Sequence, residues 1–177
     1  MERGILIAIA LFLWGQRLEV QSQEDDEALA ASVEELRTAL GEWEVVTEFL
    51  DQAGKVAGSA QGTYVFDWVV EDRVLSGRSE IPALGLASGI LFYLREKERE
   101  IEMVSVGADG KLWIMTGPLG GDMRTSQEYR TAEGRAARLR FTRFAVTEDG
   151  FESRMESTDD GGATWLPGNH QVFRRRG

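Results

Sequence analysis

The 177-residue sequence contains no cysteine, a single histidine, and 20 Lys and Arg residues against 30 Asp and Glu. Without cysteine the chain has no disulfide, thiolate metal site, thiol nucleophile or lipid-modified N-terminal Cys. With one histidine, a multi-histidine metal cluster is excluded, and a Ser-His-Asp triad would have to use His170. The formal net charge of −10 argues against nucleic-acid binding and against docking on an anionic membrane, because both need a basic surface.

The longest apolar run, Gly4 to Trp14, has eleven residues, whereas a membrane-spanning helix needs about twenty. This run suits the hydrophobic region of a secretory signal peptide, and Val20 and Ser22 supply small residues before a cleavage site. We therefore expect a signal peptide over residues 1–22, a secreted or periplasmic mature protein, and no stable membrane insertion after cleavage. The alternative is a hydrophobic N-terminal helix that stays attached.

The next segment has a helical period. Leu29, Val33, Leu36 and Leu40 recur at steps of three and four residues, which places them on one face of a helix. The pattern predicts a helix over residues 23–41, with a glycine at its end, that flanks the rest of the domain.

From residue 42 the period changes to two, which is typical of strands with one buried face. Turn formers such as Asp109-Gly110 and Asp149-Gly150 separate the runs, and no second helical pattern interrupts them. The spacing predicts an antiparallel meander or barrel over residues 42–177, in a protein that is mostly β. The expected strands are Trp43–Phe49, Tyr64–Val70, Arg73–Ile81, Ile90–Arg95, Ile101–Val106, Lys111–Gly117, Arg138–Val146, Phe151–Ser157 and His170–Arg175.

Several short motifs resemble those of lipocalins and their calycin relatives. Gly41-x-Trp43 stands where these proteins open their first strand, and Arg174 to Arg176 supply the late basic residue. Asp67-Trp68 and the late D-G-G-x-T-W resemble an uncharacterised bacterial branch of lipocalin-like proteins. The resemblance implies an antiparallel calycin-like barrel of about 8–10 strands with an internal cavity and one N-terminal helix, and it implies no particular reaction.

The segment from Thr158 to Trp165 is similar to the Asp-box of sialidases and related propellers, with Asp160, Gly162, Thr164 and Trp165 in the matching positions. In that family the box is structural. Its physical content is a hairpin in which the aspartate caps its own turn, a glycine takes positive φ, and the tryptophan packs beneath. One copy cannot make a propeller, so we interpret this segment as a structural brace.

His170 has one specific functional interpretation. Nitrobindins, small heme-binding barrels related to the lipocalins, place their iron-ligating histidine on the last strand, and His170 lies in a similar place. Those proteins continue as G-x-W-x-G-x-G, whereas here Gly41-x-Trp43 is followed by Glu44-Val45-Val46. Alternation also places Phe173 on the inner face and His170 on the outer face. The sequence therefore predicts no heme, no other cofactor and no metal site.

Candidate ligand-binding residues are those that strand alternation places among apolar neighbours. Thr47, Ser105, Thr116, Arg143 and Ser153 are polar members of such faces, and each would need a partner there. Arg143 is the most informative, because a buried arginine is unfavourable unless it is paired. Aromatic side chains would form the rest of a pocket. The candidates are Tyr64, Trp68, Tyr93, Trp113 and Arg143.

Three functions fit these observations. The preferred hypothesis is a secreted small-molecule-binding barrel for an apolar or amphipathic ligand. The second is an isomerase, cyclase or hydrolase that acts in the cavity through Arg143, Glu102 or His170. The third is a structural or interaction protein with a filled barrel. A pocket with convergent ionisable groups would favour the enzyme, and a pocket with apolar walls would favour the binding protein. A barrel filled with its own side chains would favour the structural or interaction protein. The oligomeric state stays open.

Overall fold

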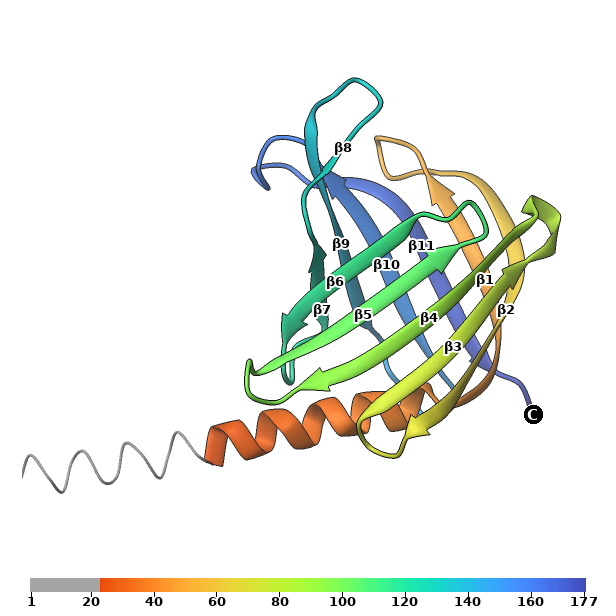
Figure 1. Cartoon of the computed structure of the whole chain (residues 1–177). Helices are drawn as coiled ribbons and strands as arrows, with labels where there is room; N and C mark the ends of the chain where they lie inside the picture. Colours follow the sequence, from red (N-terminus) through yellow and green to blue (C-terminus); the bar gives the residue numbers. More distant parts are fainter. Residues whose placement is uncertain (1–22) are drawn as a thin grey trace, which may run out of the picture.

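A computed structural model describes residues 23–177; the expected signal peptide lies outside them. In the described part, eleven strands form one antiparallel sheet that closes on itself, because β10 pairs with both β9 and β11. β8 pairs with β9 alone, so ten strands make the barrel. A helix over residues 23–39 lies across its lower end (Figure 1). This architecture is the calycin-like barrel that the motifs predict.

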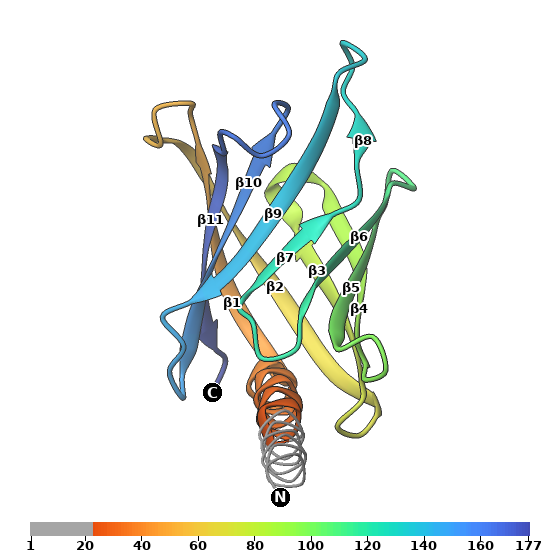
Figure 2. The ribbon, with the colours of Figure 1, turned by 90° about the vertical axis from the view of Figure 1, so that its left-hand side faces the viewer.

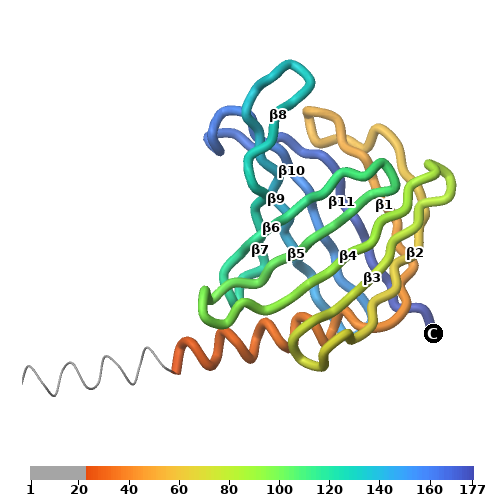
Figure 3. Tube along the Cα trace, in the orientation of Figure 1, coloured from red at the N-terminus to blue at the C-terminus, as the bar shows by residue number. Residues whose placement is uncertain are grey.

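The chain follows a simple meander around the barrel, in which each strand from β1 to β6 pairs with the next and β7 pairs with β9 (Figure 3). β9, β10 and β11 continue it, and β11 returns to β1. A single 3-10 turn, η1 (Pro82–Leu84), interrupts the described strands. The strands are β1 (Gly41–Leu50), β2 (Val56–Val70), β3 (Val74–Ile81), β4 (Leu86–Arg95), β5 (Glu100–Gly107), β6 (Leu112–Pro118), β7 (Met123–Ser126), β8 (Tyr129–Arg130), β9 (Ala136–Phe144), β10 (Gly150–Thr158) and β11 (Leu166–Arg175).

All nine predicted runs are strands. In β1, Trp43, Val45 and Thr47 are buried while the alternating glutamates face solvent, as the period of two requires. The prediction missed β7 and β8, which have four and two residues. β7 carries no alternating apolar pattern, because its two buried residues are Arg124 and Ser126.

The core cluster connects the first strand, the last strands and the helix. Trp43, 1% exposed, forms a T-shaped pair with Phe151 with ring centres 5.0 Å apart, and Phe151 stacks on Phe173 at 4.2 Å. Leu36 of the helix belongs to the same cluster, and Leu40 packs against it. The helix is therefore part of the hydrophobic core, not an appendage (Figure 2 views it beneath the barrel).

The helix does not use the whole apolar face that the sequence predicts. Leu36 is buried, but Leu29 and Val33 are half-exposed, while Ser32 is fully buried. Ser32 faces the turn after β6, where its Oγ accepts a 2.8 Å hydrogen bond from the backbone N–H of Gly120. Gly120 has φ +74, and a Cβ at this position would lie only 3.2 Å from Ala28 Cα, so a glycine lets the turn approach the helix closely. The described helical residues do not form a segment long and apolar enough to cross a membrane.

Candidate functional site

The barrel contains a cavity of about 220 Å³ that is partly open to solvent. Its walls are mostly apolar, and seven of the lining side chains are aromatic: Tyr64, Phe66, Phe92, Trp113, Phe141, Phe151 and Phe173. Met103, Met115, Met155 and aliphatic residues complete the walls. The interior is thus not filled by its own side chains, and it offers a surface suited to an apolar molecule.

The helix forms the lower wall of the cavity through Glu35, Leu36 and Ala39. Arg175 at the end of β11 holds the end of the helix, donating hydrogen bonds to the carbonyl oxygens of Leu40 at 2.7 Å and Thr38 at 3.2 Å. These last carbonyls of a helix have no partner within the helix itself, so a cation there satisfies them. The sequence places a basic residue here, and the structure identifies it as Arg175.

Two buried arginines converge on Glu35 at this end. Arg124 of β7 donates from Nη2 to both carboxylate oxygens of Glu35 at 2.7 Å. Arg143 of β9 donates to the Glu35 carbonyl oxygen at 3.2 Å and to Thr38 Oγ1 at 2.9 Å, and its Nη1 lies 3.8 Å from Glu35 Oε1. Arg124 is 0% exposed and Arg143 is 4% exposed. Two positive charges therefore share one carboxylate in a largely dry environment.

Not all donors of these guanidinium groups are used. Nε and Nη1 of Arg124 and Nε of Arg143 have no hydrogen-bond partner among the described residues. Burial lowers the pKa of Arg143 and the neighbouring Arg124 charge lowers it further, although Glu35 and Asp122 act in the opposite direction. The net shift is downward, so the surroundings do not fully compensate the charge of Arg143.

A second polar group in the barrel centres on Gln171 of β11. Its amide nitrogen donates to Thr47 Oγ1 at 2.9 Å and to the Tyr64 hydroxyl at 3.1 Å, and its carbonyl oxygen accepts a bond from Ser153 at 3.4 Å. Gln171 and Tyr64 both line the cavity. The Gln171 amide therefore supplies the hydrogen-bond partners that Thr47 and Ser153 need. The hydrogen bonds within this group are complete without a ligand.

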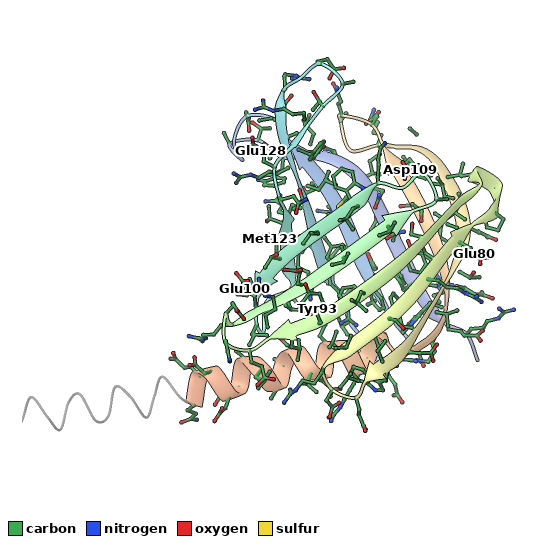
Figure 4. All side chains as sticks on the ribbon, viewed as in Figure 1. Glu80, Tyr93, Glu100, Asp109, Met123 and Glu128 are labelled. Atoms are coloured by element: carbon green, nitrogen blue, oxygen red, sulfur yellow. The ribbon has the colours of Figure 1, made fainter. Side chains whose placement is uncertain are left out.

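Of the predicted ligand-binding residues, Tyr64, Trp113 and Arg143 line the cavity. Trp68 shares the inner face with Phe66 but packs against the core cluster and does not line the cavity. Tyr93 does not line it either, because Phe92 takes the inner face of β4. Tyr93 points outward near the helix end of β4 (Figure 4) and its hydroxyl bonds Glu102.

The other polar residues that were predicted to share faces with apolar neighbours also fall partly inside and partly outside the barrel. Ser105 lines the cavity, whereas Thr116 faces outward because Trp113 and Met115 take the inner face of β6. Arg124, Glu35 and Gln171 were not predicted as site residues. Glu35 belongs to an acidic helix and Arg124 to an unrecognised strand, so neither gives a local sequence signal.

The catalytic candidates do not come together. Arg143 lies inside, whereas Glu102 and His170 lie on the outer face with Tyr93 and Glu48 as neighbours. His170 is held between two carboxylates, with Nδ1 3.0 Å from Glu48 and Nε2 2.7 Å from Glu152. No group of three or more His, Asp or Glu side chains within residues 23–177 is arranged to hold a metal ion.

Side-chain hydrogen bonds brace the hairpin between β10 and β11, and this agrees in part with the prediction from the sequence. Asp160 Oδ1 accepts the backbone N–H of Thr164 at 3.0 Å and the hydroxyl of Thr158 at 2.7 Å, and Gly162 has φ +97. Trp165 differs from the expectation: it is half-buried, and the guanidinium of Arg140 lies 4.2 Å from its ring centre. The brace is thus a surface feature away from the cavity.

Comparisons with known proteins give the fold. No family model matches the chain, and no curated protein matches it. The solved structure of Rv2717c from M. tuberculosis is similar with a TM-score of 0.54 and 14% identity, over 82% of this chain and 98% of the other. The S-type phycobiliprotein lyase CPES from Guillardia theta is similar with a TM-score of 0.51 and 13% identity, over 86% of this chain and 97% of the other. Both alignments span nearly the whole neighbour, so the chain has a complete barrel of this type.

Proposed function

We propose that the protein binds a small, predominantly apolar molecule inside its barrel. The observation that carries this proposal is the cavity of about 220 Å³ with aromatic and methionine walls. A cavity of about 150 Å³ is enough to hold benzene, so this one suits a ligand of roughly ten non-hydrogen atoms. The hypothesis of a filled barrel does not account for this cavity. Side chains that line an empty cavity lose van der Waals contacts, so a purely structural barrel would be more stable without it.

The fold alone does not separate a binder from an enzyme, since one neighbour is a lyase by name. The lining side chains favour the binder. Glu35 is the one carboxylate among them, and both of its oxygens already accept from Arg124. A guanidinium does not exchange protons at neutral pH, so Arg143 can orient or neutralise a ligand but is not a general base.

The experiment has two parts. Native mass spectrometry of protein purified from its own host should reveal a co-purified small molecule. Calorimetric titration with 1-octanol, which has nine non-hydrogen atoms, should give saturable binding to one site. Ser105→Phe, which fills the cavity, should weaken that binding at least tenfold, because the side chain takes the ligand's volume. Val104→Phe is the matched control, since Val104 faces outward on the same strand. Equal binding in both variants would place the ligand elsewhere.

The same proposal includes export, motivated by the Gly4 to Trp14 run and by the Val20-x-Ser22 pattern. The protein would then meet its ligand outside the cytoplasm. N-terminal sequencing of protein recovered from its host should start near Gln23. An exported chain that still begins with Met1 would exclude the cleavage.

A further inference from the structure

The polar end of the cavity carries an excess of positive charge. Arg124 and Arg143 contribute two guanidinium groups and Glu35 contributes one carboxylate. Asp122 also acts on Arg143, but it is exposed, so solvent screens its charge. Burying a cation without a full counter-charge is unfavourable, and the domain would avoid it unless another anion joined the group.

Anchoring the helix does not explain the whole cluster. The contacts to the helix use Nη2 of Arg124 and the two terminal nitrogens of Arg143. The remaining buried donors, Nε and Nη1 of Arg124 and Nε of Arg143, have no partner among the described residues. A buried N–H without an acceptor destabilises a protein by about 1–3 kcal/mol, and more when it is charged.

The position of the two groups relates these donors to the cavity. Arg143 lines the cavity directly, with its guanidinium 4.3 Å from the centre of the Phe151 ring. Arg124 lies behind two further lining rings, 5.7 Å from the centre of Phe92 and 5.8 Å from that of Phe141. The aromatic faces stabilise the charges partly, but they leave the N–H groups without an oxygen acceptor. A ligand oxygen at this end would meet Arg143 first.

We propose that the ligand is an anion, a small monocarboxylate whose carboxylate binds Arg143 beside Glu35 and whose apolar part extends along the aromatic walls. This inference rests on the proposed function and names its ligand class. A carboxylate would supply acceptors in the plane of the guanidinium and would balance the second positive charge. The amide of Gln171 needs no ligand, so the arginine end is where the polar group of the ligand lies.

The test compares two probes of equal chain length, octanoate and 1-octanol, by calorimetry at pH 7, where octanoate is ionised. The measured quantity is the ratio of their affinities. In the wild-type protein octanoate should bind at least tenfold more tightly than octanol. Arg143→Met should bring this ratio close to one, because it removes the charge and the donors at similar volume. Arg140→Met is the matched control: Arg140 is on the same strand but faces outward with Glu156, and this variant should keep the wild-type ratio.

Glu35→Gln provides a test in the opposite direction and does not depend on the folding of R143M. It removes the competing carboxylate but keeps an acceptor for Arg124, so the ratio should rise severalfold. A merely structural role of the cluster predicts no such rise. A wild-type ratio near one, or a ratio unchanged in both R143M and E35Q, would overturn the carboxylate site while leaving the binding function intact. Absence of saturable binding by either probe would instead overturn the proposed function.

Discussion

The guanidinium carbon of Arg175 lies 4.4 Å from the centre of the Trp43 ring, directly across the pairing of the last strand with the first. Trp43 donates from Nε1 to the carbonyl oxygen of Ala39 at 2.8 Å, and Arg175 bonds two further carbonyls at the same helix end. The closure of the barrel and the docking of the helix therefore depend on the same two side chains.

Trp43→Ala should lower the free energy of unfolding by about 3–5 kcal/mol, because it removes a fully buried ring and the packing between β1, β10 and the helix. Trp165→Ala should lower it by only about 1–2 kcal/mol, since Trp165 is half-buried and contacts Arg140 at the surface. Urea denaturation of both variants measures the difference. Equal losses would mean that the hairpin brace is as important to the core as Trp43.

Arg124→Met should destabilise the domain by about 2–4 kcal/mol, because it leaves the largely buried Glu35 carboxylate without its main partner. The matched control is Arg37→Met on the helix that carries Glu35, which breaks the exposed pair with Asp72 and should change stability by at most about 1 kcal/mol. Adding Glu35→Leu to Arg124→Met should not recover the loss, because it also removes the counter-charge of the buried Arg143. A double variant more stable than Arg124→Met alone would contradict this account of the cluster.

The period of two and the turn formers were enough to predict the barrel, because each strand buries one face of its own sequence. The same rule could not place Tyr93. The run from Ile90 to Leu94 is apolar on both faces, so alternation does not say whether Phe92 or Tyr93 points inward. Only the partner of the Tyr93 hydroxyl, Glu102 on the outer face, distinguishes the two.

The charged end of the cavity was not predictable for a different reason. Arg124 and Glu35 are 89 residues apart, and each looks like an ordinary surface charge in its own segment. A buried ion pair depends on tertiary contacts, so it leaves no periodic pattern. Arg143 could be found because the apolar residues around it are neighbours in sequence, and the structure places it inside.

Asp160 makes part of the stability dependent on acidic pH. The backbone N–H of Thr164 and the hydroxyl of Thr158 lower the pKa of Asp160 from 3.8 to about 2. A depressed folded-state pKa contributes stability that is present above the unfolded pKa and is lost as the pH falls through the folded one. The stability difference between wild type and Asp160→Asn should therefore be constant at neutral pH and shrink as the pH falls below 3.8. Urea melts across this range measure it, and parallel curves would exclude a role for the ionised carboxylate.

His170 changes the pH dependence of stability in the direction opposite to Asp160. Burial lowers its pKa, but hydrogen bonds to Glu48 and Glu152 and their charges outweigh burial, so the net pKa is raised above 6.5. A raised folded-state pKa contributes stability that is complete below 6.5 and is lost as the pH rises through the folded value. The stabilisation relative to His170→Gln should thus be largest in mild acid and decline as the pH rises above 6.5. A difference that grows with pH would show that the histidine is neutral between the two glutamates.

We expect no heme binding through His170. A proximal histidine must offer one ring nitrogen to the iron and face the cavity. His170 faces outward, stacks on Phe144 with ring centres 6.0 Å apart, and has both nitrogens within hydrogen-bond distance of carboxylates. Ligation would require β11 to shift its register by one residue, which would also turn Phe173 out of the core. Hemin titration should therefore give no His170-dependent Soret band, and wild type and His170→Ala should bind 1-octanol equally. A Soret band that disappears in His170→Ala would assign this barrel to heme.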